Sequence, residues 1–326
     1  MLPPYRPMYD ISMWIMNPSG ATIKIHTCYF CYFNLYYFMQ TPIEYLHEAE
    51  EENTAVGHFN FAAIDMLWGI FEAAKEHDVP VFLGTSEGER GYVGPRQAVA
   101  LTQSLRDQYG YPVFLNADHT YDIQKAKQAV DIGYDSVIID GADLAYEENV
   151  KKTKEIVEYA KTSENDVLIE GELGYIGASS TMRDEIPDGA EIDGKQLVQP
   201  ELAKRFVDDT GIDMLAPAVG NIHGMLKGQS NPDIHEELIA DIRKAAGVPL
   251  VLHGGSGVTD EDFRAAIKAG ISLIHVSTEI RVAYRDAIQQ SLTENPQELA
   301  PYRYMAPAKE AVTEVVSEKI ELFNSA

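Results

Sequence analysis

The chain has 326 residues, 45% hydrophobic and 24% charged, a composition typical of a soluble enzyme with one large domain or two modest ones. Its 26 basic and 51 acidic side chains give a net charge of −25, which repels nucleic acid and anionic lipid, so we expect neither partner. Two cysteines, Cys28 and Cys31, cannot build a disulfide framework. We therefore expect a cytoplasmic protein.

Residues 1–38 differ from the rest of the chain, because they hold ten aromatic residues and only three charged ones. Their apolar run is shorter than the roughly 20 residues that a membrane-spanning helix needs, and they lack the layout of a secretory signal. We favour a disordered extension or a start-site artefact over an aromatic anchor. The globular domain is expected over residues 39–326, because Thr41-Pro42-Ile43-Glu44 has the cap, first-turn proline and acidic residue of a helix start.

From Thr54 onward, short apolar runs alternate with longer helical patterns, which is typical of βα units and a parallel sheet. The expected strands are Ala55–Asn60, Val79–Thr85, Pro112–His119, Ser136–Asp140, Val167–Leu173, Met214–Val219, Pro249–Gly254 and Leu273–Thr278. Helical patterns between them include Ile64–His77, Pro95–Gln108 and Ile123–Ile132. This order predicts an α/β fold, a (β/α)8 TIM barrel. An open doubly wound sheet is disfavoured, because no G-x-G-x-x-G motif follows the first strand.

The segment between the fifth and sixth expected strands is unusually long, at about forty residues, and residues 175–199 within it are polar and rich in turn formers. An insertion at the carboxyl end of a barrel strand lies over the active face, so we predict a mobile lid, with a loop of no function as the alternative. Extra helices are expected over Arg281–Leu292 and Ala308–Leu322. The second exceeds what a barrel needs and is a candidate for subunit contact.

Titratable residues gather at the expected carboxyl ends of the strands, where barrel enzymes place their catalytic groups. They are His119, His223, His253, His275, Asp118, Asp140 and Glu172. Each one alone is explained by a hydrogen-bonded core histidine or a helix cap. Together they are harder to explain structurally, because three neutral imidazoles with one open position are what a catalytic zinc requires.

A glycine-rich turn, His253-Gly254-Gly255-Ser256-Gly257, follows the seventh expected strand and precedes a helix that begins near Asp260. Backbone N–H groups in such a turn bind phosphate without many basic side chains, so the acidic composition does not exclude an anionic ligand. Further donors or local positive charge are expected from Gly224, Lys227, Ser277 and Thr278.

From about Met39 to its C-terminus, the chain resembles the class II, metal-dependent fructose-bisphosphate or ketose-bisphosphate aldolase family. The resemblance is carried by Gly57-His58-Phe59-Asn60, Asn116-Ala117-Asp118-His119, Val137-Ile138-Ile139-Asp140-Gly141, Glu170-Gly171-Glu172-Leu173-Gly174, Gly220-Asn221-Ile222-His223-Gly224 and the turn after His253. It implies an aldehyde-lyase that cleaves a ketose 1,6-bisphosphate, with fructose 1,6-bisphosphate as the leading substrate and a homo-oligomer (dimer or tetramer) as the working form. Tagatose 1,6-bisphosphate, another ketose phosphate, or a phosphosugar-binding protein that has lost turnover are the alternatives.

The resemblance also implies a role for each matching residue. His119, His223 and His253 would hold a catalytic Zn²⁺, and Asp118 would exchange a proton with the C4 hydroxyl of the ketose. Substrate, phosphate or further metal contacts would come from Asn60, Ser86, Gly224, Gly254, Ser256, Asp140 and Glu172. The last two would form a second divalent-metal position, and a monovalent cation is expected near the phosphate.

Two departures from the family pattern bear on the sugar more than on the class of reaction. His275 stands where the family usually has an asparagine that touches substrate. The lid reads Gly177-Ala178-Ser179-Ser180 where the family has two glycines followed by acidic residues. Acids appear only at Asp184 and Glu185, so we expect either that one of these handles the C–H proton or that this step is slow.

Overall fold

The structure is a computed structural model that describes residues 12–16, 22–26, 40–177, 180–190, 192 and 197–325. The chain divides into two units, Met1–Gln40 and Thr41–Ala326. In the first unit, β1 (Ser12–Met16) and β2 (Thr22–His26) pair as antiparallel strands. The interpretation of residues 1–38 as an extension or a start-site artefact stays a prediction.

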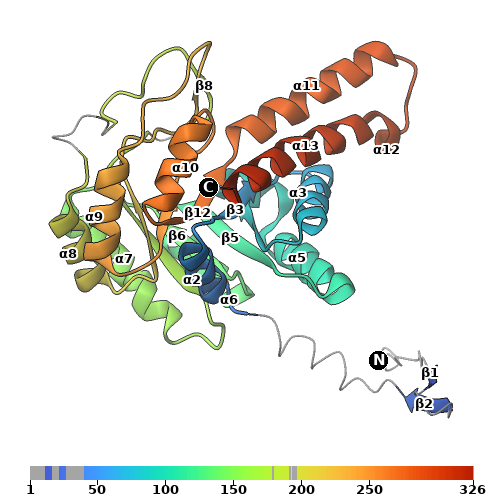
Figure 1. Ribbon diagram of the computed structural model, residues 1–326, viewed down its shortest axis with the longest axis horizontal. Helices are drawn as coiled ribbons and strands as arrows, with labels where there is room; N and C mark the ends of the chain where they lie inside the picture. Colours follow the sequence, from blue (N-terminus) through green and yellow to red (C-terminus); the bar gives the residue numbers. More distant parts are fainter. Residues whose placement is uncertain are drawn as a thin grey trace. The chain divides into compact units, whose positions relative to one another are not determined.

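Eight parallel strands of the second unit close into a barrel (Figure 1). They are β3 (Val56–Asn60), β4 (Val81–Thr85), β5 (Val113–Thr120), β6 (Ser136–Ile139), β7 (Leu168–Leu173), β9 (Met214–Pro217), β11 (Leu250–Leu252) and β12 (Ile271–Val276). Their order around the barrel is their order in the chain, and β12 pairs with β3 to close it. The eight predicted strands and the TIM-barrel architecture are confirmed.

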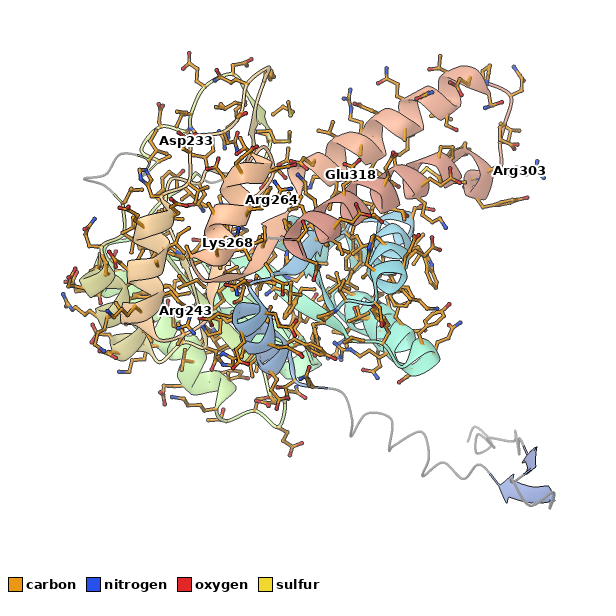
Figure 2. All side chains as sticks on the ribbon, viewed as in Figure 1. Asp233, Arg243, Arg264, Lys268, Arg303 and Glu318 are labelled. Atoms are coloured by element: carbon orange, nitrogen blue, oxygen red, sulfur yellow. The ribbon has the colours of Figure 1, made fainter. Side chains whose placement is uncertain are left out.

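Helices follow the strands and surround the barrel, as the alternating pattern predicts. They are α3 (Ile64–His77), α4 (Glu87–Val93), α5 (Pro95–Tyr109), α6 (Ile123–Ile132), α7 (Tyr146–Ala160), α8 (Pro200–Thr210), α9 (Glu236–Ala246) and α10 (Asp260–Lys268). Exposed charged side chains, such as Lys268 of α10, lie on these outer helices (Figure 2). Among the described residues, no helix is long and apolar enough to cross a membrane.

Helix α2 (Pro42–Glu52) begins where the sequence predicts a helix start. The Glu44 carboxylate accepts hydrogen bonds from the backbone N–H and the hydroxyl of Thr41, at 2.7 and 2.8 Å. Leu46 and Ala49 are buried and join the apolar cluster inside the barrel, so α2 closes the end where the strands begin. The opposite end, where the strands finish, is left for the polar residues.

Two successive layers of the barrel interior lie two residues apart along the strands. Because side chains on a strand alternate between faces, residues two positions apart point to the same side. The layer nearer α2 is apolar and contains Val56, Phe82, Phe114, Leu168, Met214, Val251 and Leu273. The next layer is polar, equally buried, and contains His58, Asn116, Glu170, His253 and His275. We call these the apolar layer and the polar layer.

The long segment between β7 and α8 is tied to the loop that follows β9. Its short strand β8 (Met182–Arg183) pairs in parallel with β10 (Met225–Leu226). The Arg183 Nε also donates to the carbonyl oxygen of His223, at 2.8 Å. The mobile lid stays a prediction, and Ala178 and Ser179 of its motif lie outside the described residues.

The last helices, α11 (Thr278–Glu294) and α13 (Ala306–Phe323), lie side by side and extend from the barrel, with the short α12 (Pro301–Tyr304) at their far end (Figure 1). Helix α13 buries Val312 against α3, where a Cβ at Gly69 would collide with it. Helix α13 therefore packs within the chain on this side, and its proposed role in subunit contact stays a prediction.

Candidate active site

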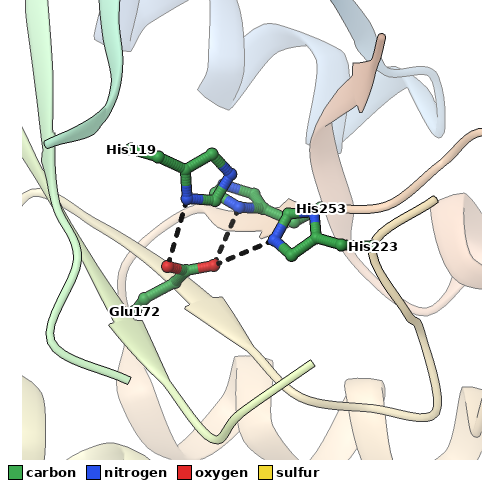
Figure 3. A group of neighbouring side chains, drawn as sticks. All are labelled: His119, Glu172, His223 and His253. Carbon is green, nitrogen blue, oxygen red and sulfur yellow. Dashed lines mark ion pairs between the residues drawn. The ribbon is translucent and has the colours of Figure 1, made fainter. Parts of the chain in front are cut away.

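The polar residues predicted from the strand ends meet at the carboxyl end of the barrel (Figure 3). His119 lies on β5, Glu172 on β7, His223 in the loop after β9, and His253 directly after β11. Ligand atoms of these four side chains all lie within 4.8 Å of one another. Segments far apart in the sequence thus supply one buried cluster of three imidazoles and a carboxylate.

Strand β5 contributes two consecutive residues, Asp118 and His119, to the same site. A regular strand would point them to opposite faces. Here the pairing with β6 shifts register between Ala117 and Thr120, and His119 adopts a left-handed backbone with φ of 37°. Such irregularities redirect side chains and are maintained at functional sites by the surrounding structure. The local distortion lets both side chains reach the site.

The turns that carry His223 and His253 pack directly against each other. Gly254 has φ of 66°, and a Cβ there would collide with the carbonyl oxygen of Ile222. Asn221 Nδ2 donates to the carbonyl oxygen of His253, at 2.9 Å. Glycine and the asparagine bridge therefore fix the distance between the two histidines.

Three ring nitrogens face the Glu172 carboxylate (Figure 3). The distances are 3.4 Å from His119 Nδ1, 3.8 Å from His223 Nε2 and 3.0 Å from His253 Nδ1. His253 Nδ1 and Glu172 Oε2 are buried and make no hydrogen bond to any described residue. Leaving such atoms unsatisfied costs free energy, and a divalent cation taking the imidazole nitrogens would remove that cost. The cluster therefore fits a metal ion.

The charges around the cluster set the protonation of its histidines. Burial lowers the pKa of His223 to about 4, so its ring is neutral at pH 7. Burial would also lower the pKa of His253, but the Glu172 and Glu170 carboxylates outweigh it and raise the pKa to about 9. Asp118 and Glu172 likewise hold the pKa of His119 well above its ordinary value despite burial. A metal ion must therefore displace protons from two of its three imidazoles.

Asp140 and Glu172 lie together beside the histidines. Asp140 Oδ2 is 3.0 Å from His119 Nδ1, and both carboxylates line a cavity of about 350 Å³ together with Tyr121 and Tyr175. Burial and the neighbouring Glu172 raise the pKa of Asp140. This arrangement brings together the two residues predicted to form a second metal position.

Asp118 lies on the other side of His119. Its Oδ2 accepts a hydrogen bond from Asn60 Nδ2 at 2.7 Å, whereas its Oδ1 makes no hydrogen bond within the described part of the chain. Burial would raise the pKa of Asp118, but His119 and His275 hold it well below the ordinary value. An ionised carboxylate with one fixed and one free oxygen has the arrangement of a general base.

A narrow cavity opens between Asp118 and the glycine-rich turn. It is lined by Asn60, Asp118, His119, Ser180, His223, Gly224, Gly254, Ser256, His275, Ser277 and Thr278. Ser256 Oγ accepts from the backbone N–H groups of Ser277 and Glu279, at 3.3 and 3.2 Å, which ties the turn to the N-terminus of α11. The Ser277 hydroxyl is buried without a hydrogen bond among the described residues. A helix N-terminus beside a glycine turn, after the last two barrel strands, is suited to an anion.

Comparisons with known proteins agree with this geometry. The family model for class II fructose-bisphosphate aldolase matches residues 40–326. The chain belongs to the class II fructose-bisphosphate aldolase family. It is 36% identical over 285 residues to a fructose-bisphosphate aldolase of Staphylococcus aureus and to a probable fructose-bisphosphate aldolase of Bacillus subtilis, with 86% of this chain and 96% of each relative covered.

Solved structures give the same assignment. The YdjI aldolase from Escherichia coli K12 is 29% identical, with a TM-score of 0.73 and coverage of 87% of this chain and 97% of that one. A putative fructose-1,6-bisphosphate aldolase from Coccidioides immitis is 26% identical, with a TM-score of 0.75 and coverage of 87% and 96%. This aldolase is therefore a metal-dependent lyase, and its family implies a phosphosugar substrate.

Some residues expected to take part in this aldolase's site lie outside the cavities around the histidines. Lys227 and Asp184 are exposed and pair with each other at 2.9 Å, and Glu185 is exposed as well. The Gly255 N–H donates to the carbonyl oxygen of His275 at 3.0 Å, within the barrel. Ser86, in contrast, lines a cavity of about 220 Å³ together with His119 and His223.

Sequence reasoning missed residues that contact the predicted catalytic and metal-binding groups. Glu170 is buried behind His253, whose Nε2 lies 2.7 Å from its Oε1, as in the carboxylates that orient metal-binding histidines. The alternation along β7, which puts Glu170 and Glu172 on one face, was the available signal.

Glu89 supports Asn60 in the same way. Its Oε2 accepts from Asn60 Nδ2 and from the Ser86 N–H, both at 2.8 Å, and its Oε1 pairs with Arg281 at 2.6 Å. The sequence pattern of Ser86 and Glu89 indicates a helix start, and nothing in it points to Asn60 or Arg281.

Proposed function

We propose that this aldolase uses Zn²⁺ held by His119, His223 and His253 to cleave fructose 1,6-bisphosphate into dihydroxyacetone phosphate and glyceraldehyde 3-phosphate. The observation that carries the proposal is the meeting of three imidazole nitrogens with Asp118, whose free oxygen faces a cavity bounded by a helix N-terminus. The names of the relatives support this sugar as the first to test.

The glycine-rich turn after His253 and the N-terminus of α11 orient the ketose. The N–H groups at the start of α11 and in the glycine turn would bind the phosphate of the dihydroxyacetone half, with Ser256, Ser277 and Thr278 as side-chain donors. Gly224 lies at the same cavity. With its phosphate bound there, the rest of the sugar extends toward the histidines and Asp118. A monovalent cation near the phosphate would further balance its charge.

Asp118 performs the proton transfer that starts cleavage. Its Oδ1 accepts the proton of the C4 hydroxyl, while Asn60 keeps Oδ2 in place. As that O–H bond breaks, the C4 oxygen forms the aldehyde carbonyl, and the C3–C4 bond breaks with its electron pair left on the dihydroxyacetone half. When bound, Zn²⁺ acts as a Lewis acid that stabilises the negative charge developing on that half.

The proton that returns to C3 needs a separate donor. Asp184 and Glu185 are the proposed donors, and both are exposed in this structure, so the lid must move to bring either to the cavity. We assign a second divalent-metal position to Asp140 and Glu172, which lie together beside the zinc ligands. We also propose that the enzyme acts in the cytoplasm as a dimer or tetramer.

The first experiment measures release of dihydroxyacetone phosphate from fructose 1,6-bisphosphate by the purified protein, after chelation, and after zinc is added back. Activity that is lost on chelation and restored by zinc supports both the reaction and the metal. Zinc-loaded protein that cleaves only tagatose 1,6-bisphosphate changes the sugar, and protein that cleaves neither overturns the proposal. The same assay on residues 39–326 alone tests our proposal that the first 38 residues are dispensable.

A further inference from the structure

Three imidazole rings form a column through the polar layer. His58 of β3 and His275 of β12 are partners in the strand register, and their rings stack with centroids 3.5 Å apart and planes 4° apart. On its other face, His275 stacks on His253 at 4.3 Å and 22°. All three rings are buried. The proposed reaction gives a role to His253 and leaves His58 and His275 unexplained.

A shared metal ion does not account for this pair, although ligand atoms of His58, Asp118 and His275 lie within 4.8 Å of one another. The lone pair of an imidazole nitrogen lies in the plane of its ring. Because the rings of His58 and His275 are parallel and face to face, their lone pairs run side by side and do not converge on one ion. The pair is better explained by what the stack holds in place.

His58 is fixed from two sides. The Asn116 amide nitrogen donates to Ser136 Oγ at 2.6 Å, so its Oδ1 faces His58 Nε2 at 3.2 Å and requires that nitrogen to carry a proton. Gly84 lies against the ring, where a Cβ would collide with His58 Cε1. The His58 ring is therefore held in one orientation on the wall of the barrel.

His275 has no such attachment. Neither of its ring nitrogens makes a hydrogen bond to any part of the chain that the structure describes. Its orientation is set by the rings above and below it. In that orientation its Nδ1 lies 3.5 Å from Asp118 Oδ1, the oxygen that Asn60 leaves free.

We propose that His275 is a positioning residue for Asp118, and that His58 keeps His275 in place by stacking. The Nδ1–H of neutral His275 holds Asp118 Oδ1 in the cavity, and that oxygen keeps a second lone pair for the substrate hydroxyl. Together with Asn60 at Oδ2, this gives the carboxylate one orienting contact at each oxygen. The inference rests on the proposed function only in giving Asp118 the proton transfer.

The test is a pair of substitutions made singly and together, with fructose 1,6-bisphosphate as substrate. His58→Ala removes the ring on which His275 stacks. We expect kcat to fall about tenfold with KM and zinc content unchanged, because Asp118 is present but misplaced. In a His275→Asn protein the amide does not depend on stacking, so adding His58→Ala is expected to change kcat less than about twofold. Equal losses in both backgrounds, or loss of zinc with His58→Ala, would overturn the proposal.

A second readout does not depend on catalysis or on any variant folding. Nitrogen NMR of the zinc-loaded full chain with ¹⁵N-labelled histidine reports which ring nitrogen of His275 carries the proton. We expect a neutral ring protonated at Nδ1, and a proton at Nε2 instead would contradict the proposal even in the wild-type protein. If the wild type cleaves no ketose, the proposed function fails while this measurement still decides on His275. His47→Ala, at an exposed histidine on α2, is the matched control and should change neither signal.

Discussion

The two layers of the barrel interior lie on the same strands, two residues apart, and differ in what they contribute. In the apolar layer, Phe82 and Phe114 pack with ring centroids 5.2 Å apart, and its side chains have no polar atoms that need a hydrogen bond. In the polar layer, His58 Nδ1, Glu170 Oε2 and both ring nitrogens of His275 are buried without a hydrogen bond from the described residues. The side chains of both layers are buried, and the layers differ in that only the polar layer contains polar atoms that lack hydrogen-bond partners.

This difference shows how one barrel separates stability from chemistry. Burying apolar side chains stabilises the fold, whereas buried polar atoms without partners destabilise it. What the polar layer supplies is orientation: Glu170 directs His253, and His275 faces the free oxygen of Asp118. Substitutions in the polar layer should therefore alter metal binding or turnover, and substitutions in the apolar layer should alter the free energy of unfolding.

The largest effect is expected from Asp118→Ala, which removes the proposed base two residues beyond the polar layer on β5. We expect kcat/KM to fall about 10²- to 10⁴-fold, the usual contribution of a positioned acid or base, while zinc content stays unchanged. His119→Ala is the matched comparison and should lose zinc and activity together. Turnover close to that of the wild type in the Asp118→Ala protein would remove the assignment.

Phe82→Ala tests the other layer. Phe82 is fully buried, so its truncation leaves a cavity and should lower the free energy of unfolding by about 3–5 kcal/mol. Zinc content and kcat of the protein that remains folded should match the wild type, because no atom of the polar layer changes. Denaturant titration and zinc analysis measure both quantities. A clear loss of zinc with little change in unfolding would break the separation between the layers.

The fold and the meeting of the three histidines were predictable because their signals are local in the sequence. Apolar runs bounded by turn residues mark the eight strands, and a histidine directly after such a run lies at the carboxyl end of the barrel. His253 follows this rule, whereas His223 lies farther along, in the loop after β9. His119 follows it only through the irregularity of β5, which the sequence does not reveal.

The missed residues depend on which strands become neighbours and at what register. Glu170 meets a histidine 83 positions away, and Glu89 meets Arg281 across 192 positions. His58 and His275 become partners only because the last strand closes on the first. Lys227, in contrast, is close to His223 in sequence, yet it points to Asp184 on the long segment. Proximity in the sequence therefore did not predict the direction in which a side chain points.

Glu170→Gln sharpens the comparison within the polar layer, because it keeps the shape of the side chain and removes its charge. Carboxylates behind metal-binding histidines typically contribute about 10- to 100-fold in metal affinity, and we expect a loss of that size here. Burial raises the pKa of Glu170, so a neutral amide should not lower the free energy of unfolding. Competition with a chelator and thermal unfolding measure the two effects, with Glu76→Gln on the exposed side of α3 as control. Unchanged zinc affinity would show that Glu170 does not act on His253.

Zinc affinity should also depend on pH. Without metal, the Glu172 and Glu170 carboxylates raise the pKa of His253 to about 9, so below that pH a proton occupies the ring that zinc needs. Affinity should therefore rise from pH 6 to pH 8 by about tenfold per pH unit for each proton displaced. His223, with a pKa of about 4, is already neutral there and adds no slope. In the Glu170→Gln protein the proton on His253 is held less firmly, so the slope should flatten at the upper end of this range. An affinity that does not change with pH in the wild type would mean that the carboxylates leave His253 unprotonated, and the polar layer would then orient the ring without controlling its charge.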